Sequence, residues 1–368
     1  MVKKLDYLEG LRGIACLIVV LDHCVNSFLP EARFTNFDGR FGDLYRIVAS
    51  SPMNFIYSGV TPVFIFFILS GFVLSKKFIE TGDTKVLAKG AMKRYFRLLG
   101  PVVFSTLAMY LSVKYAENAG VFDASHYNIK DIIYQAFVGA FISTEPLING
   151  PLWTMRFEFI GSLIVFLLLA LTNDHDNKKT IYYFALMFFV TLGNDSYLFS
   201  LFIFGIICAS DNNTKEGIAN IKNNILLVII FIISIFISTY PFPRWNVEVI
   251  GLYKYINFSE NQALVHNTWH FLGAILFFTV ALNSEIIKRL FSAKVCVWIG
   301  KLSFSIYVIH NVVVFNLEHF IHLDLSREKN FILMTLITVI ICILVSIPFE
   351  KYIDRKSTKA SNIITAKI

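Results

Sequence analysis

The first apolar stretch of the chain carries an arginine and a histidine at positions where both are costly. Residues 8–28 read LEGLRGIACLIVVLDHCVNSF, with Arg12 near one end and His23 well inside. The eleven-residue spacing makes about three helical turns, so both side chains share one face, roughly 16 Å apart along the axis. A cation at the end of this helix and a titratable imidazole deep in the bilayer suit a long ligand that has an anionic head and a reactive tail. The alternative is that Arg12 only reaches the interface and His23 only packs against another helix.

A second segment, NGPLWTMRFEF, places ionisable residues where a helix would enter the membrane. Arg156 and Glu158 are two residues apart and point to opposite sides of a helix, so each needs a partner elsewhere. Glu158 is therefore a candidate catalytic or orienting carboxylate. Trp153 is a candidate binding residue, with an ordinary interfacial position as the alternative.

A third segment, IGKLSFSIYVIHNV, carries Ser303, Tyr307 and His310 at positions i, i+4 and i+7 of an apolar helix. His310 lies about as far from the predicted cytoplasmic end of its helix as His23 does from its own. The pattern therefore predicts two histidines at similar depth in the outer half of the bilayer. Plain helix packing by the serine and the tyrosine is the alternative.

Cationic side chains crowd the segment KRYFRLLGP, which contains Lys93, Arg94 and Arg97. Such a cluster binds phosphate well, arginine through paired hydrogen bonds and lysine as a point charge. One alternative is that these residues only satisfy the preference for Lys and Arg on the cytoplasmic side of the membrane. The other is that they contact anionic lipid. In FFILSGFVL, Ser70 and Gly71 would let a ligand or another helix approach closely, and helix packing is the simpler interpretation.

The composition places these residues in a membrane protein. Of the 368 residues, 56% are hydrophobic and 16% charged, and apolar runs of bilayer length recur along the chain. The formal charge of +7 comes from Lys and Arg in particular loops, which indicates membrane topology rather than nucleic-acid binding. No linker divides the chain, so residues 1–368 form one predicted domain. The five cysteines have no paired or ligand-like spacing, so neither disulfides nor a metal site are expected.

The apolar runs predict an all-α integral membrane bundle of about ten transmembrane helices with both termini cytoplasmic. The predicted spans are Leu11–Phe28, Phe55–Leu74, Leu98–Tyr115, Leu152 to the residues before Asp174, Thr180–Leu192, Tyr197–Ala209, Ile225–Tyr240, His266–Leu282, Val297–Leu317 and Phe331–Phe349. Lys85–Arg97 is expected to form a basic helix in the cytoplasmic interface, and Ile132–Ser143 a re-entrant or interfacial piece. No internal repeat is visible, which argues against a transporter built from inverted halves.

Taken together, these segments resemble the acyltransferase-3 family of polytopic membrane proteins, which O-acylate surface polysaccharides, lipids and other exported acceptors. The resemblance covers nearly the whole chain and depends on motifs in the family's order: LEGLRGIACLIVVLDH, FFILSGFVL, KRYFRLLGP, GPLWTMRFE and IGKLSFSIYVIH. The chain departs from the pattern at Asp22, where an aromatic or small residue is more usual. This change leaves the arginine–histidine pair intact.

The resemblance implies transfer of an acyl group, with acetyl expected, from cytoplasmic acyl-CoA to a hydroxyl of an exported or cell-surface glycan or glycolipid. The donor phosphates would meet Arg12, Arg94 and Arg97, while His23 acts as general base or as a transient acyl carrier. The other expected donor-binding residues are Lys93, Trp153 and Ser70. The residues expected to orient the base or the acceptor are Glu158, Tyr307 and His310.

Two other classes of function remain open from the sequence. A transporter or flippase would use the same buried charges as a substrate pathway, and a silent binding or sensory protein could share the fold. The expected surroundings are the inner (plasma) membrane and its lipids, with a homo-oligomer left open. Acceptor choice is expected to depend on outer loops that carry no decodable motif, namely Leu29–Asn54, Glu117–Asp131 and Pro241–Val265.

Overall fold

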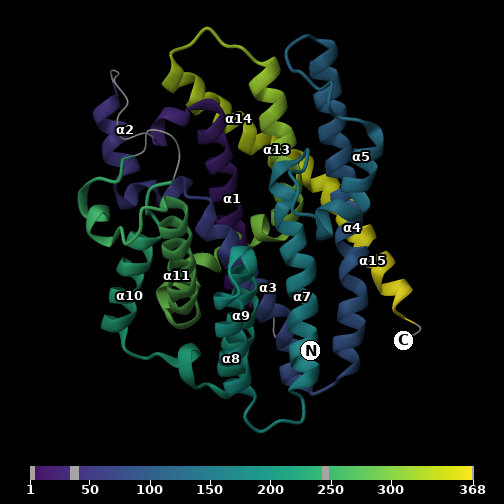
Figure 1. Ribbon diagram of the computed structural model, residues 1–368, viewed down its shortest axis with the longest axis vertical. Helices are drawn as coiled ribbons and strands as arrows, with labels where there is room; N and C mark the ends of the chain where they lie inside the picture. Colours follow the sequence, from purple (N-terminus) through teal and green to yellow (C-terminus); the bar gives the residue numbers. More distant parts are fainter. Residues whose placement is uncertain (1–4, 34–40, 243–247, 367–368) are drawn as a thin grey trace.

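Every regular element of the described chain is a helix. The computed structural model describes residues 5–33, 41–242 and 248–366, and within them no strand occurs (Figure 1). In this part of the chain, six helices are long and apolar enough to cross a bilayer. They are α3 (Val60–Thr81), α4 (Lys85–Asn118), α7 (Trp153–Leu171), α11 (Gln262–Asn283), α13 (Lys294–Phe320) and α14 (Arg327–Phe349). The chain is therefore an all-α, multi-pass membrane protein, as its apolar runs predict.

Four further helices occupy predicted spans but are either charged or short. They are α1 (Asp6–Phe28), α8 (Lys178–Thr191), α9 (Tyr197–Thr214) and α10 (Asn224–Ile237). α1 carries both acidic and basic side chains along its length. α8 and α10 have 14 residues each, which extend about 21 Å, whereas the hydrocarbon core is about 30 Å thick. The ten-span count and the cytoplasmic termini therefore stay predictions.

Short elements connect these helices. Those before α7 are η1 (Pro30–Arg33), α2 (Gly42–Ala49), η2 (Pro52–Tyr57), α5 (Ile129–Tyr134), η3 (Gln135–Gly139), α6 (Ala140–Ile142) and η4 (Gly150–Leu152). Those after it are η5 (Asn194–Ser196), η6 (Gly217–Asn220), η7 (Gly251–Ile256), α12 (Glu285–Phe291), η8 (Glu350–Asp354) and α15 (Arg355–Ile364). The segment 132–143 is thus helical but interrupted by a π turn, and parts of two predicted outer loops (34–40 and 243–247) lie outside the described residues.

The structure corrects the prediction of a separate interfacial helix at Lys85–Arg97. α4 is one continuous helix of 34 residues that includes both this basic segment and the predicted span from Leu98. Pro101 lies inside the helix, where neighbouring helices in a membrane bundle can make up for its missing hydrogen bond. A helix of this length extends about 51 Å, so its basic half can leave the bilayer without a bend.

The residues that follow the last predicted span are helical as well. α14 continues through η8 into α15, which lies alongside α4 (Figure 1). A Cβ atom at Gly100 of α4 would lie 2.0 Å from the hydroxyl oxygen of Ser357 in α15. The end of the chain is therefore packed against the same helix that carries the basic cluster.

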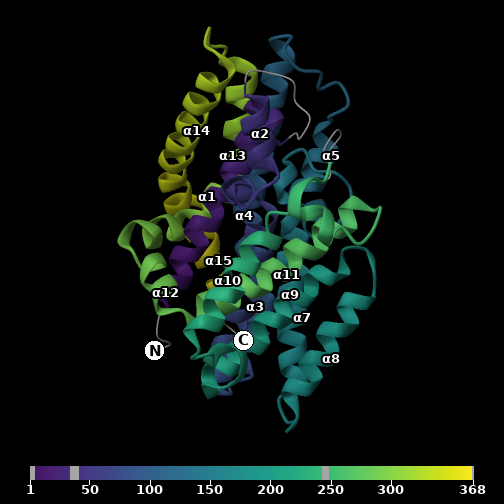
Figure 2. The same cartoon turned by 90° about the vertical axis from the view of Figure 1, so that its left-hand side faces the viewer.

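The central contact of the bundle joins α1 and α13, which run side by side in the same direction. A Cβ atom at Gly300 would lie 1.9 Å from the carbonyl oxygen of Glu9, and one at Gly13 would lie 2.7 Å from the nitrogen of Gly300. Only glycine permits so close an approach of two backbones. Further along, the Cys16 thiol donates to the carbonyl of Ser303 at 3.2 Å. α1 also packs against α3, α12 and α14, and so lies inside the bundle (Figure 2).

We predict that Gly300→Ala destabilises the protein by about 1–3 kcal/mol, because the added methyl group must push α1 away from α13. The measurement is thermal unfolding of the purified protein in detergent. Gly150→Ala is the matched control, since a Cβ atom at Gly150 meets no atom within 4 Å. Equal midpoints for the two variants would contradict the close contact.

Candidate active site

A cavity of about 260 Å³ lies between α1, α3, α4, α7 and α13. It brings together residues that are far apart in the sequence, and each of the five helices contributes polar groups to its wall. The sequence-predicted site residues that line it are Arg12, Ser70, Arg94, Arg97, Glu158 and Tyr307. More than half of the predicted site residues therefore share one space.

A buried ion pair forms part of the cavity wall. The Nη2 atom of Arg94 lies 3.0 Å from Oε2 of Glu158, and the Ser70 hydroxyl lies 2.8 Å from each carboxylate oxygen. The side chains of Arg94 and Glu158 are 8% and 15% exposed. Glu158 thus has the partner that the sequence requires for it. The Nε atom of Arg94 is buried without a hydrogen-bond partner, so the guanidinium can still donate to a bound oxygen.

The rest of the wall carries more charge. Arg12 pairs with Glu9, one turn earlier in α1, at 2.9 Å. Arg97, Lys301 and Asp354 also line the cavity. Arg97 and Lys301 are exposed, whereas Arg94 is buried. Cationic groups therefore extend from the exposed part of the wall to its buried part.

Tyr307 lies where the cavity approaches the two histidines. Its hydroxyl donates to the carbonyl oxygen of Pro151 at 3.0 Å and lies 3.0 Å from the Thr154 hydroxyl, which can donate to it. The Tyr307 ring meets Phe66 edge to face at 6.1 Å and lies 5.6 Å from the ring of His310. The tyrosine is thus fixed in place, and its ring separates the cavity from His310.

The rings of His23 and His310 meet edge to face with their centroids 4.7 Å apart. His310 is completely buried, and its Nδ1 atom lies 2.6 Å from the carbonyl oxygen of Tyr307. A carbonyl only accepts, so we assign the proton to Nδ1 and the lone pair to Nε2. That Nε2 atom is buried without a hydrogen-bond partner. His23 therefore faces the interior of the bundle and contacts a neutral imidazole.

The chain matches a known protein family over most of its length. Residues 5–351 match the family model described as an acyltransferase domain. The chain belongs to the acyltransferase-3 family. No curated protein and no solved structure is significantly similar to it. The family implies acyl-transfer activity, and the match covers all the helices that line the cavity.

Two predicted site residues of this acyltransferase-3 protein lie near the cavity but do not line it. Lys93 is half-buried, one position before Arg94 in α4. The Trp153 ring is 44% exposed and packs edge to face against Phe67 and Phe157, at centroid distances of 6.4 and 5.6 Å. Their roles in donor binding stay predictions. In the described residues, no group of three or more His, Cys, Asp and Glu side chains forms a candidate metal site.

The structure adds three charged residues to the cavity that sequence reasoning missed, namely Glu9, Lys301 and Asp354. Glu9 could have been found, because it lies three positions before Arg12 on the same helix. A lysine near a helix end, such as Lys301, is common in membrane proteins and does not indicate a site. Asp354 lies beyond the last predicted span. No sequence signal connects these two to the cavity.

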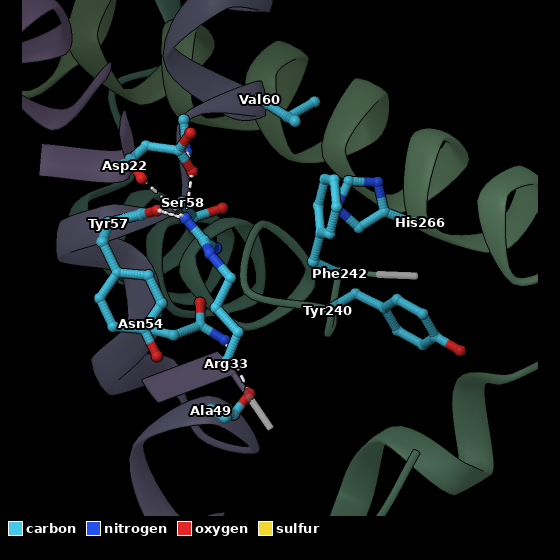
Figure 3. A pocket seen from close by; sticks show the side chains of 11 residues that line it. Asp22, Arg33, Ala49, Asn54, Tyr57, Ser58, Val60, Tyr240, Phe242 and His266 are labelled. Carbon is cyan, nitrogen blue, oxygen red and sulfur yellow. Dashed lines mark hydrogen bonds and ion pairs between the residues drawn. The ribbon is translucent and has the colours of Figure 1, made fainter. Parts of the chain in front are cut away.

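A smaller pocket of about 20 Å³ lies beyond His23, toward the other end of α1 (Figure 3). The Nη2 atom of Arg33 lies 2.6 Å from Oδ1 of Asp22 and also donates to the carbonyl of Tyr57 at 3.2 Å. In Figure 3 the guanidinium points at Asp22, with the rings of Phe242 and His266 on the other side of the pocket. The space fits about one water molecule.

The ion pair in this smaller pocket links the segment after α1 to α1 itself, next to His23. The Asp22 carboxylate also accepts from the backbone N–H of Gly59 at 3.2 Å, so it links η1, η2 and the start of α3 to α1. Burial raises the pKa of Tyr57 to about 12, which keeps its hydroxyl protonated and able to donate to the carbonyl of Ala32. The ion pair with Arg33 therefore explains structurally why an aspartate stands at position 22 instead of an aromatic or small residue.

We predict that Glu158→Gln destabilises the protein by about 3–5 kcal/mol, because the variant leaves the Arg94 guanidinium buried and without its counter-charge. The matched control is Glu9→Gln, which breaks the more exposed Arg12–Glu9 pair and should cost about 1 kcal/mol or less. Chemical unfolding in detergent measures both. A smaller loss for Glu158→Gln than for Glu9→Gln would contradict the burial of this pair.

Proposed function

We propose that this acyltransferase-3 protein moves an acyl group, with acetyl as the expected group, from cytoplasmic acyl-CoA to a hydroxyl of an exported or cell-surface glycan or glycolipid. One observation carries the proposal more than any other. A cavity lined by cations ends one aromatic ring away from the buried His310, whose ring contacts that of His23. A long donor with an anionic head and a reactive end suits such a path.

The donor would enter with its thioester first. Its phosphate groups would meet the cations of the cavity, Arg12, Arg94 and Arg97, with Lys93 nearby on α4. The pantetheine arm would then run along the apolar part of the wall, which includes Val63, Phe66 and Met155, toward Tyr307. About 16 Å of helix between Arg12 and His23 gives the arm room to extend.

His23 would act as general base on the acceptor hydroxyl. The acceptor oxygen attacks the carbonyl carbon of the thioester, a C–O bond forms, and the C–S bond breaks. The hydroxyl proton passes to His23 and then to the leaving thiolate, so CoA departs as the free thiol. A transient acyl-histidine would divide the same transfer into two displacements.

His310 is suited to orient His23. Its Nδ1 is engaged with the Tyr307 carbonyl, so its Nε2 can accept an N–H from a neighbouring imidazole. Such a bond would fix which nitrogen of His23 is free to take the acceptor proton. In this proposal His310 is a positioning residue, and Tyr307 holds it in place.

The acceptor would approach from the outer side, near the end of α1. The proposed location is the inner (plasma) membrane, where the donor is cytoplasmic and the product is exported. Membrane lipids would surround the bundle, and a homo-oligomer is compatible with its exposed apolar faces. Outer loops that contain residues 29–54 and 241–265 would contact the acceptor.

We predict that His23→Ala abolishes acyl transfer and leaves the protein folded and inserted, because only the base is lost. Purified protein is incubated with acetyl-CoA labelled in the acetyl group, and release of free CoA and acylated product is followed. His175→Ala, at an exposed position between α7 and α8, is the control and should retain full activity. Uptake of label without turnover by the wild-type protein would favour a carrier, and an active His23→Ala variant would sink the proposed role of His23.

We predict that Arg97→Ala raises the KM for acyl-CoA by about tenfold and changes kcat by less than about twofold, because a phosphate contact outside the reacting centre contributes mainly to binding. Steady-state kinetics over a range of acyl-CoA concentrations gives both constants. Lys85→Ala changes a cation at the exposed start of the same helix and serves as the control. A fall in kcat alone would contradict the phosphate role.

A further inference from the structure

The cavity contains four cations and three carboxylates among its lining residues. Two of the cations already have partners, since Arg12 pairs with Glu9 and Arg94 pairs with Glu158. In the described part of the chain, Arg97 and Lys301 form no ion pair. Arg97 interacts electrostatically with Asp354, so among the described lining residues the positive charge without a counter-charge is carried by Lys301 of α13.

These two side chains also differ from the paired cations in their surroundings. Arg97 and Lys301 are both exposed, whereas Arg94 is 7% exposed. Asp354 lies on the same wall and interacts electrostatically with Arg97, which leaves Lys301 as the cation best placed to attract a bound anion. An acyl-CoA carries two kinds of phosphate. Its diphosphate follows the pantetheine arm directly, and its ribose carries a separate phosphate monoester.

A phosphate monoester bears a charge of nearly −2 at neutral pH and is best matched by two cations that are not already held in a direct salt bridge. If the thioester reaches His23, about 16 Å of arm places the diphosphate near Arg12 and Arg94. The monoester then lies nearer the exposed end of the cavity. We infer that Lys301, together with Arg97, binds the ribose phosphate monoester of the donor and makes the protein select CoA over dephospho-CoA. This inference rests on the proposed function.

The competing explanation is that Lys301 only keeps positive charge on the cytoplasmic side. The chain offers a matched control for it. Lys294 lies seven residues earlier on the same face of α13, is also exposed, and does not line the cavity. The two lysines contribute equally to topology, so only a ligand contact separates them.

The experiment measures binding of CoA and of dephospho-CoA to the full-length protein in detergent, by isothermal titration. We expect the wild-type protein to bind CoA about tenfold more tightly than dephospho-CoA. Lys301→Ala should reduce this preference to less than about threefold by weakening CoA binding alone. Lys301→Arg and Lys294→Ala should both keep the preference.

Two results would overturn the inference and leave the donor proposal standing. One is equal wild-type affinity for the two compounds, and the other is an unchanged preference in Lys301→Ala. A wild-type protein that binds neither compound would instead contradict the proposed donor itself. An equal loss of both affinities in Lys301→Ala is one form of the second result, because the preference is unchanged, and it would show a role in folding of the cavity rather than in recognition of the monoester.

Discussion

The close backbone contact between α1 and α13 determines how the proposed site residues of these two helices lie relative to one another. Glycines at positions 13 and 300 bring the two helices together near their N-terminal ends, and the Cys16–Ser303 hydrogen bond continues the contact. Because the helices run in the same direction, the register set by the glycines also brings His23 against His310. The cations of these two helices then lie near the close contact, and the two imidazoles lie farther along the same helices. A bulkier residue at either glycine would disturb both ends of the site together.

Charge in this bundle is compensated on both sides of His23. Toward one end of α1, Glu158 holds Arg94 and Ser70, and toward the other end Asp22 holds Arg33. Arg94 and Glu158 lie 64 positions apart on different helices, whereas Arg33 and Asp22 are only 11 positions apart, and both pairs are largely removed from solvent. Uncompensated charges would be expensive there, so these pairs act as fixed points between which the histidines are held.

The sequence was sufficient to predict the class of fold and much of the cavity. Helical spacing alone places Arg12 and His23 on one face, and the family's motifs connect them with Glu158, Tyr307 and His310. The partner of Glu158 was not predictable from spacing, since Arg94 lies 64 residues earlier on another helix. The continuity of α4 was missed because a basic segment followed by an apolar one has the composition of two elements. Lys301 was missed because a lysine at a helix end has an ordinary explanation, and only three-dimensional packing shows what it faces.

The same arrangement has a consequence for how the chain is made. α1 leaves the ribosome well before α13, because 287 positions separate Cys16 from Ser303. At about 5–20 residues per second, translation of that interval takes on the order of 15–60 s. During this time α1 can pack against α3 but not against α13, so its polar groups would need protection by the insertion machinery until α13 arrives. Premature stop codons before α13 should therefore yield fragments that quality-control proteases remove quickly.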